Sequence, residues 1–172
     1  TIYPKSMYNI EEVELEINSI LKSFFEHVII IPDQIVTDSL FESIKPAIIG
    51  ELNNALNTIY VCVAWFTDDE LRDVLENKRR LGVDVKVITF KDGVNGKHGV
   101  DFGEIPHKEI RGSRLFIMHR KYCVIDNHVV ISGSYNWTDN AAERNDENIL
   151  IVKDWKTANQ HTREFLDEWR NY

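Results

Sequence analysis

Short apolar runs rich in β-branched residues alternate with helical patterns through the first half of the chain, and this alternation constrains the fold most strongly. Residues 58–66 (TIYVCVAWF) and 83–90 (VDVKVITF) have the composition of buried strands. Between them, Thr67-Asp68 forms a capping pair for a helix that stops at Gly82. Strand, helix and strand in this order are typical of an α/β sheet in which some strands are parallel.

The same criteria predict the remaining elements. Apolar residues recur every three or four positions over 9–26, which predicts an amphipathic helix with an acidic outer face. Glycines and charges over 91–104 predict a loop. Further helices are expected over 43–57 and 154–170, and further strands over 28–31, 109–111, 121–125, 129–132 and 148–152. We therefore predict a mixed β-sheet flanked by helices on both faces, in a domain over 30–172 that follows an N-terminal helical extension over 1–29.

The composition excludes disordered, fibrous and membrane-inserted classes. The chain has 172 residues, which fits one domain. Its longest uncharged apolar stretch, Ile59–Phe66, is far shorter than the roughly 20 residues of a membrane-spanning helix. Cys62 and Cys123 lie within apolar runs, so we expect buried thiols, a reducing compartment and a cytoplasmic location. The first residue is Thr1, which leaves open further domains or subunits.

The net charge of −8 conceals an uneven distribution along the chain. Residues 1–77 contain 4 basic and 14 acidic residues, whereas residues 78–121 contain 11 basic and 5 acidic residues, a net charge of +6. A basic segment between acidic ends can present a positive field to a polyanion such as nucleic acid. Alternatively, Lys78, Arg79 and Arg80 are simply the solvated face of a helix.

Four polar residues gather near the ends of the two strands predicted over 121–125 and 129–132. His119 and Lys121 are two positions apart on an extended segment, so their side chains share one face. Ser134 and Asn136 repeat that spacing, and a turn between the strands would return them to the same end of the sheet. A nucleophile, a cation and two neutral donors are what attack on a phosphodiester requires.

The spacing His119-x-Lys121-x4-Asp126-x6-Gly133-Ser134-x-Asn136 resembles the signature of the phospholipase D superfamily. The segment over 145–148 resembles the family segment that carries an acidic residue before the last core strand. The broader resemblance covers about residues 30–170. It therefore implies a phospholipase D-like fold and a phosphodiesterase.

The resemblance also implies a role for each matching residue. His119 would be the nucleophile that forms a covalent phosphohistidine, and Glu147 would orient its imidazole by accepting from the other ring nitrogen. Lys121, Ser134 and Asn136 would hold the phosphate. Arg120 and Trp137 complete the predicted substrate-binding set, with Trp137 either stacking on a base or packing inward.

Asp126 matches the signature and is counted with the catalytic set. Strand parity nevertheless places its side chain opposite to those of His119 and Lys121. We therefore interpret Asp126 as a structural residue that pins the turn between the two strands.

The chain carries a single copy of the motif, although cleavage through a covalent intermediate needs both a nucleophile and an acid for the leaving group. Family members with one copy pair as two-fold dimers, which would set one His119 from each chain across a shared site. In this arrangement the two Lys121 ammonium groups supply the positive charge. The resemblance thus implies a homodimer that needs no metal or other cofactor.

Three functions are compatible with the motif. The basic segment before His119 favours a nuclease that cleaves DNA or RNA. A phospholipid hydrolase or transferase would need an apolar rim or a docking helix, and the polar face predicted over 9–26 is acidic. The third function is a catalytically inactive nucleic-acid-binding module.

Two kinds of metal site are alternatives to a histidine-based active site. The cysteines and histidines lack the paired spacing of zinc ligands. Asp84-x-Lys86, with Asp73 upstream, resembles part of a metal-dependent nuclease centre, although Asp-x-Lys is common in exposed strands.

Overall fold

The computed structural model describes residues 16–17, 19, 35–112 and 117–172. The chain divides into two units, Thr1–Asp33 and Gln34–Tyr172. Residues 16, 17 and 19 are helical, within the helix predicted over 9–26. The rest of that helix, the strand predicted over 28–31 and the domain boundary predicted after residue 29 lie outside the described residues.

Seven strands in the described part of the second unit form one mixed sheet in the order β1-β7-β6-β5-β2-β3-β4. β2, β3 and β4 are parallel, whereas the pairings from β1 across to β2 are antiparallel. The parallel part contains the predicted strand–helix–strand unit. The strands are β1 (Val36–Leu40), β2 (Thr58–Val63), β3 (Asp84–Phe90), β4 (His107–Ile110), β5 (Lys121–Ile125), β6 (Val129–Gly133) and β7 (Ile149–Lys153).

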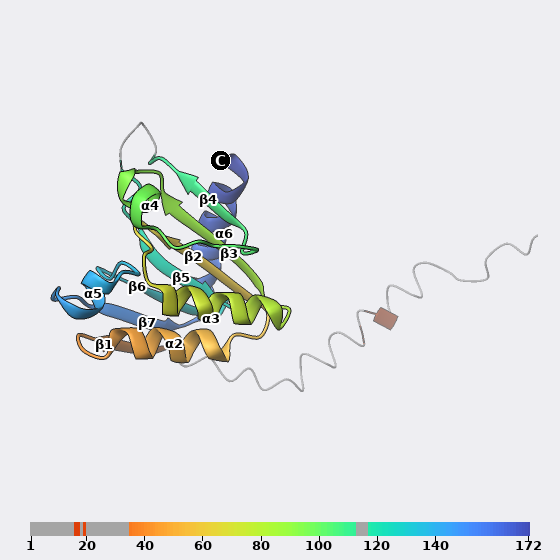
Figure 1. Ribbon diagram of the computed structural model, residues 1–172. Helices are drawn as coiled ribbons and strands as arrows, with labels where there is room; N and C mark the ends of the chain where they lie inside the picture. Colours follow the sequence, from red (N-terminus) through yellow and green to blue (C-terminus); the bar gives the residue numbers. More distant parts are fainter. Residues whose placement is uncertain (1–15, 18, 20–34, 113–116) are drawn as a thin grey trace, which may run out of the picture. The chain divides into compact units, whose positions relative to one another are not determined.

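Helices cover both faces of this sheet, as predicted (Figure 1). α2 (Ile44–Asn54) and α3 (Asp69–Arg80) pack on one face, and α6 (Trp155–Asn171) packs on the other. The strand residues alternate accordingly. Cys123 of β5 belongs to the core beneath α2 and α3, whereas Tyr122 belongs to the core beneath α6.

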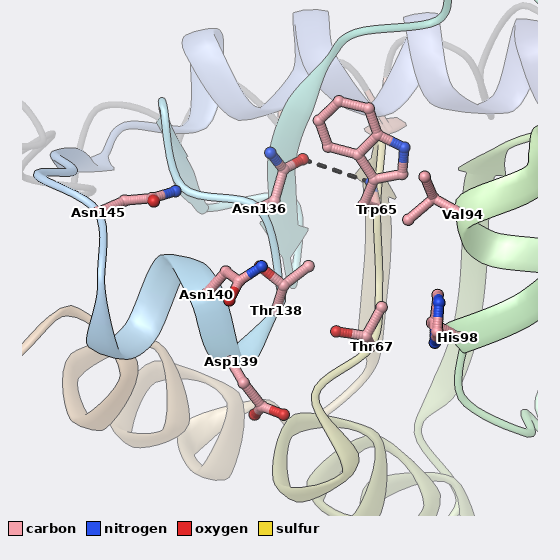
Figure 2. Close-up of a pocket in the computed structure, with 9 residues that line it drawn as sticks. All are labelled: Trp65, Thr67, Val94, His98, Asn136, Thr138, Asp139, Asn140 and Asn145. Carbon is pink, nitrogen blue, oxygen red and sulfur yellow. Dashed lines mark hydrogen bonds between the residues drawn. The ribbon is translucent and has the colours of Figure 1, made fainter.

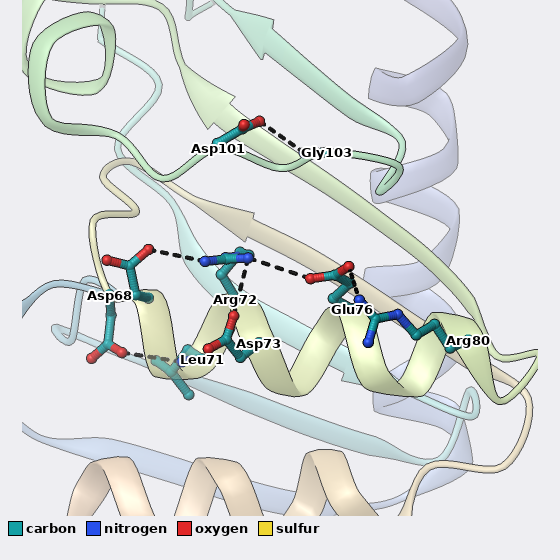
Figure 3. A network of polar contacts seen from close by, with 9 residues as sticks. Asp68, Leu71, Arg72, Asp73, Glu76, Arg80, Asp101 and Gly103 are labelled. Carbon is teal, nitrogen blue, oxygen red and sulfur yellow. Dashed lines mark hydrogen bonds and ion pairs between the residues drawn. The ribbon is translucent and has the colours of Figure 1, made fainter.

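The ends of α3 follow the capping chemistry that the sequence predicts. Asp68 Oδ1 accepts a hydrogen bond from Leu71 N at 3.1 Å (Figure 3), and Lys45 Nζ pairs with Asp68 Oδ2 at 2.8 Å. Gly82 follows the helix with a φ of +92°, which only glycine adopts without strain. The chain therefore turns directly from α3 into β3.

Three short elements were not predicted. α4 (Gly93–His98) lies inside 91–104, so the prediction of a loop there is wrong in part. Asp92 caps α4 by accepting hydrogen bonds from Val94 N and Asn95 N at 3.0 Å. α5 (Asp139–Glu143) follows the cap residue Thr138. β1 is exposed along most of its length and lacks an alternating pattern. Helices this short are specified by their caps rather than by apolar periodicity.

Cys62 and Cys123 are buried free thiols, as predicted. Of the helices in the described residues, none combines the length and apolar character needed to cross a bilayer.

Candidate active site

The start of β5 brings His119 and Lys121 beside the indole of Trp65. Lys121 pairs with Val63 in the antiparallel β2–β5 ladder, so the residues after Val63 lie beside those before Lys121. The rings of His119 and Trp65 are 5.7 Å apart between centroids at 77°, and Lys121 Nζ lies 5.9 Å from the indole centroid. The exposed His119 and the half-buried Lys121 thus contact the same indole, in agreement with their predicted shared face.

Lys121 has the electrostatic setting of an anion-binding residue. Its Nζ donates a hydrogen bond to the backbone oxygen of His119 at 3.1 Å. Burial lowers the pKa of Lys121 below its ordinary value, and the nearby charge of Glu147 opposes that shift. A partly desolvated ammonium gains when an anion replaces the lost water contacts. This position therefore suits a non-bridging phosphate oxygen.

Ser134 and Glu147 meet where β6 ends and β7 begins. Ser134 Oγ donates to Glu147 Oε2 and accepts from Asn148 N at 3.1 Å. Asn145 Nδ2 donates to Glu147 Oε1 at 3.0 Å. Glu147 therefore orients the Ser134 hydroxyl. Its role as the acceptor for the imidazole of His119 stays a prediction.

Asn136 connects the turn after β6 to the end of β2. Its Oδ1 accepts a hydrogen bond from Trp65 N at 3.3 Å. The same two residues line a pocket of about 570 Å³ whose walls come from α4 and α5 (Figure 2). Of the predicted phosphate-binding residues, Asn136 alone lines this pocket, and Lys121 reaches its edge through the indole.

Asp126 lies at the opposite end of β5 from His119. Its carboxylate accepts hydrogen bonds from Leu56 N and Asn57 N, both at 2.7 Å, and from Thr58 N at 2.8 Å. The residue has a φ of 52°, in the left-handed region. Asp126 therefore pins the turn between β5 and β6 to the start of β2, as its strand parity indicated, and lies apart from the candidate active site.

Arg120 points toward α6, and it lines a cavity of about 510 Å³ together with His119. Strand alternation turns it away from its two neighbours, and its guanidinium pairs with Glu164 at 2.8 Å and Glu168 at 2.9 Å. These two ion pairs anchor α6 to the segment that leads into β5, and the substrate-binding role of Arg120 stays a prediction.

The structure does not support a substrate-binding role for Trp137, because the residue is only 3% exposed. It packs edge-to-face on Phe66 with ring centroids 5.1 Å apart. The inward-packing alternative therefore holds, and Trp137 offers no face for a base to stack on.

Several basic residues of the segment over 78–121 are paired within the fold. Lys78 is buried and donates to Asn53 O at 3.0 Å, and Arg80 pairs with Glu76 in the network on α3 (Figure 3). Lys108 Nζ donates to the backbone oxygen of Trp169. These contacts within the fold use part of the segment's positive charge, which weakens the charge argument for a polyanion.

The metal-site alternative at β3 finds no support in the contacts. Both carboxylate oxygens of Asp84 contact Lys86, and one accepts from Tyr60 OH at 2.9 Å. Asp73 pairs with Arg72 on α3 at 3.0 Å. Over residues 16–17, 19, 35–112 and 117–172, no group of three or more His, Cys, Asp or Glu side chains is placed to hold a metal ion.

Residues 48–169 match the family model described as "Cardiolipin synthase, PLD-like domain". The chain belongs to the phospholipase D superfamily. A mitochondrial cardiolipin hydrolase of Xenopus laevis is 32% identical over 143 residues, which cover 79% of this chain and 64% of the relative. Across the mitochondrial cardiolipin hydrolases that it matches, the chain spans 50% to 64% of their length.

Two solved structures have the same fold as this chain. Nuc from Salmonella typhimurium, described as a phospholipase D family member, superposes with a TM-score of 0.70 at 23% identity, covering 80% of this chain and 94% of that one. NucT from Helicobacter pylori gives a TM-score of 0.70 at 18% identity, over 78% and 95%. The predicted superfamily and fold class are thereby confirmed.

Trp65 is the residue beside His119 and Lys121 that the sequence analysis does not identify. It ends a buried apolar run, which made it look like one more core residue. Its indole is half-buried, and Nε1 donates a hydrogen bond to Asp92 at 2.8 Å. This bond fixes the ring between the start of α4 and the start of β5. The available signal was its position two residues after the end of β2, in a connection between elements, where functional residues are frequent.

Proposed function

We propose that the chain is a phosphodiesterase that cleaves DNA or RNA without a metal ion, through a covalent phosphohistidine at a site shared by two copies of the chain. The single observation that carries this proposal is the pairing of an exposed imidazole, His119, with a partly desolvated ammonium, Lys121, beside one indole. A nucleophile and a cation at one edge of the sheet match the needs of phosphoryl transfer.

In the proposed first step, a neutral His119 ring nitrogen attacks phosphorus and forms a P–N bond. The P–O bond to the leaving group breaks, and the protonated His119 of the second copy donates its proton to the departing alkoxide. Lys121 and the hydroxyl of Ser134 stabilise the non-bridging oxygens as negative charge builds on them. In the second step, water attacks phosphorus, the second imidazole takes the proton of that water, and the P–N bond breaks.

A nucleic acid is favoured as substrate by the polar lining of the pocket beside Trp65. Asparagine and threonine side chains form much of this lining, including Thr67, Asn136 and Asn140. Acyl chains would leave these polar groups without partners, at a cost in free energy. Sugars and bases would bond to them.

A phospholipid hydrolase is the second candidate, because the mitochondrial cardiolipin hydrolases are similar to this chain over most of its length. One structural feature favours it. A second cavity of about 510 Å³ contains His119 together with Ile117 and Tyr172, which are 60% and 56% exposed. Its α6 side also carries three carboxylates, those of Glu164, Asp167 and Glu168. Exposed apolar side chains beside a reactive imidazole are suited to contact with a lipid surface.

Cleavage assays in excess EDTA separate these candidates. Labelled single-stranded DNA, single-stranded RNA, duplexes and cardiolipin vesicles would be incubated with the wild type, His119→Ala and the control His128→Ala, which changes an exposed histidine in the β5–β6 turn. We expect nucleic acid cleavage that survives chelation, persists in His128→Ala and disappears in His119→Ala.

Other outcomes would point elsewhere. Cleavage that disappears in EDTA would contradict the histidine mechanism. Hydrolysis of vesicles without cleavage of any nucleic acid would favour the lipid candidate. An adduct that resists alkali but is lost in acid, formed by the wild type alone, would identify the phosphohistidine directly.

A further inference from the structure

The pocket between α4 and α5 is chemically distinct from the phosphate-binding edge of β5. Figure 2 shows Val94 and His98 on the α4 side, with Asn140 and Asn145 on the side of α5. Three asparagines and two threonines line it, together with the indole of Trp65, and its lining among the described residues includes no lysine or arginine. A polar wall with one carboxylate, Asp139, and no ammonium or guanidinium group suits an uncharged ligand rich in hydrogen-bonding groups.

The pocket adjoins the reactive residues through two shared side chains. Trp65 lines it and contacts both His119 and Lys121, while Asn136 lines it and is bonded to Trp65 N. A phosphate held by Lys121 would therefore have the pocket within reach of its neighbouring sugar and base. The Nε1–Asp92 hydrogen bond holds the indole in a fixed orientation, so the aromatic wall is preorganised.

We propose that this pocket binds one unpaired nucleobase of the nucleotide next to the scissile phosphate, a proposal that rests on the nuclease function above. Amide side chains such as Asn140 and Asn145 both donate and accept, which matches the edges of bases. An aromatic ring supplies a surface for the base itself. A phosphate is disfavoured there, because Asp139 is the charged carboxylate of the lining.

The proposal has a consequence for the form of the substrate. A base enters a side pocket only when it is unstacked and unpaired. In a duplex a base pair must therefore open first, which costs free energy. We therefore expect faster cleavage of single strands than of duplexes with the same sequence.

The test uses single-stranded oligonucleotides in which one nucleotide lacks its base while the backbone is unchanged. Cleavage at each bond is compared with the intact strand, using the full chain. Loss of a stacked base costs roughly tenfold, so we expect kcat/KM for one of the two bonds beside the abasic nucleotide to fall by about that factor, while distant bonds are cut as before.

Two variants connect this loss to the pocket. Asn140→Trp would fill the pocket from α5, and Asn77→Ala is the matched control, because Asn77 is exposed on α3. We expect Asn140→Trp to lower kcat/KM on the intact strand by about tenfold and to leave cleavage beside the abasic nucleotide unchanged, with Asn77→Ala like the wild type on both. The comparison of strands on the wild type alone needs no variant to fold.

The outcomes separate this proposal from the nuclease function. Equal cleavage of intact and abasic bonds by an active wild type would overturn the base pocket and leave the nuclease standing. The same holds for an equal loss on both strands in Asn140→Trp. A wild type that cleaves no nucleic acid but hydrolyses cardiolipin vesicles would overturn both.

Discussion

Asp126 joins the turn between β5 and β6 to the start of β2 through three backbone amides, so its removal would leave those amides without their acceptor. We expect Asp126→Ala to lower the free energy of unfolding by about 2–4 kcal/mol, because bonds to a charged acceptor are stronger than neutral ones. Asp126→Asn should lose less, since asparagine tolerates the left-handed backbone and keeps one acceptor oxygen. Urea unfolding measures both changes.

A matched control is Asp101→Ala, because Asp101 accepts a single exposed bond from Gly103 N at 2.9 Å. Its unfolding free energy should stay within about 0.5 kcal/mol of the wild type. The folded fraction of Asp126→Ala should still cleave substrate, unlike His119→Ala. A fully stable but inactive Asp126→Ala would show that this carboxylate takes part in catalysis.

Gly133 stands where β6 and β7 approach most closely, directly before Ser134. A Cβ added there would lie 2.1 Å from Asn148 O and 2.8 Å from Ile149 Cα, both backbone atoms that cannot move independently. We expect Gly133→Ala to lower the free energy of unfolding by roughly 2–4 kcal/mol. Activity should fall further, because the same shift displaces the Ser134–Asn148 contact.

Gly96→Ala is the control for this substitution. Gly96 lies in α4, and a Cβ there would meet nothing within 4 Å. Replacing a helical glycine by alanine stabilises a helix by up to about 1 kcal/mol. Thermal unfolding of the two variants should therefore shift in opposite directions, and equal destabilisation would show that the Asn148 contact is not the cause.

Strand alternation explains what could be predicted at single residues. It placed His119 and Lys121 on one face and Asp126 apart from them, and the coordinates agree. The same rule places the side chain of Arg120 on the opposite face from those of His119 and Lys121, where it pairs with Glu164 of α6. Trp137 follows the end of β6, where no alternation exists to predict whether an aromatic packs inward.

At the scale of elements, β4 is the edge strand whose attachment depends on a titratable residue. His107 begins it, its ring stacks on Phe102 with centroids 4.0 Å apart, and its Nε2 lies 2.7 Å from Thr89 Oγ1. Burial lowers the pKa of His107 from 6.5 to about 4. The folded chain therefore binds this proton less tightly than the unfolded chain does.

The sign of the pH dependence follows from that difference. The neutral ring stabilises the fold above pH 6.5, and this contribution is lost as the pH falls through about 4. We expect a loss of roughly 2 kcal/mol over this interval, reduced from the full shift by partial exposure. His107→Phe should remove it. Parallel curves of urea midpoint against pH for the two proteins would contradict the assignment.

The long helices were predictable and the two shortest were not, for a physical reason. α3 and β3 match their predicted ranges closely, since each carries a clear apolar pattern and α3 also has the capping residue Asp68. α4 and α5 are six and five residues long. They hold the walls of the pocket beside Trp65, so the site residues that sequence reasoning missed come mainly from the elements that it missed.

At the scale of the whole molecule, the order of the strands depends on pairings between distant segments. β2 lies between β3, its neighbour in sequence, and β5, which is antiparallel to it. Local patterns predict strands but not such partners, because the pairing free energy depends on side chains brought together by the fold. The turn between β5 and β6 allowed that one pairing to be predicted, whereas the order of the seven strands in the described sheet was not.

The shared site predicts how activity depends on the mixture of two kinds of chain. If each site needs one His119 from each copy, wild type mixed and refolded with His119→Ala forms active sites only where two wild-type chains meet. Activity should then follow the square of the wild-type fraction, and mixtures with the active control His128→Ala should lose nothing. The same mixtures at rising protein concentration should show specific activity that increases as chains associate. Activity linear in the wild-type fraction would assign the complete reaction to one chain of 20.1 kDa and would leave proton donation to a different group.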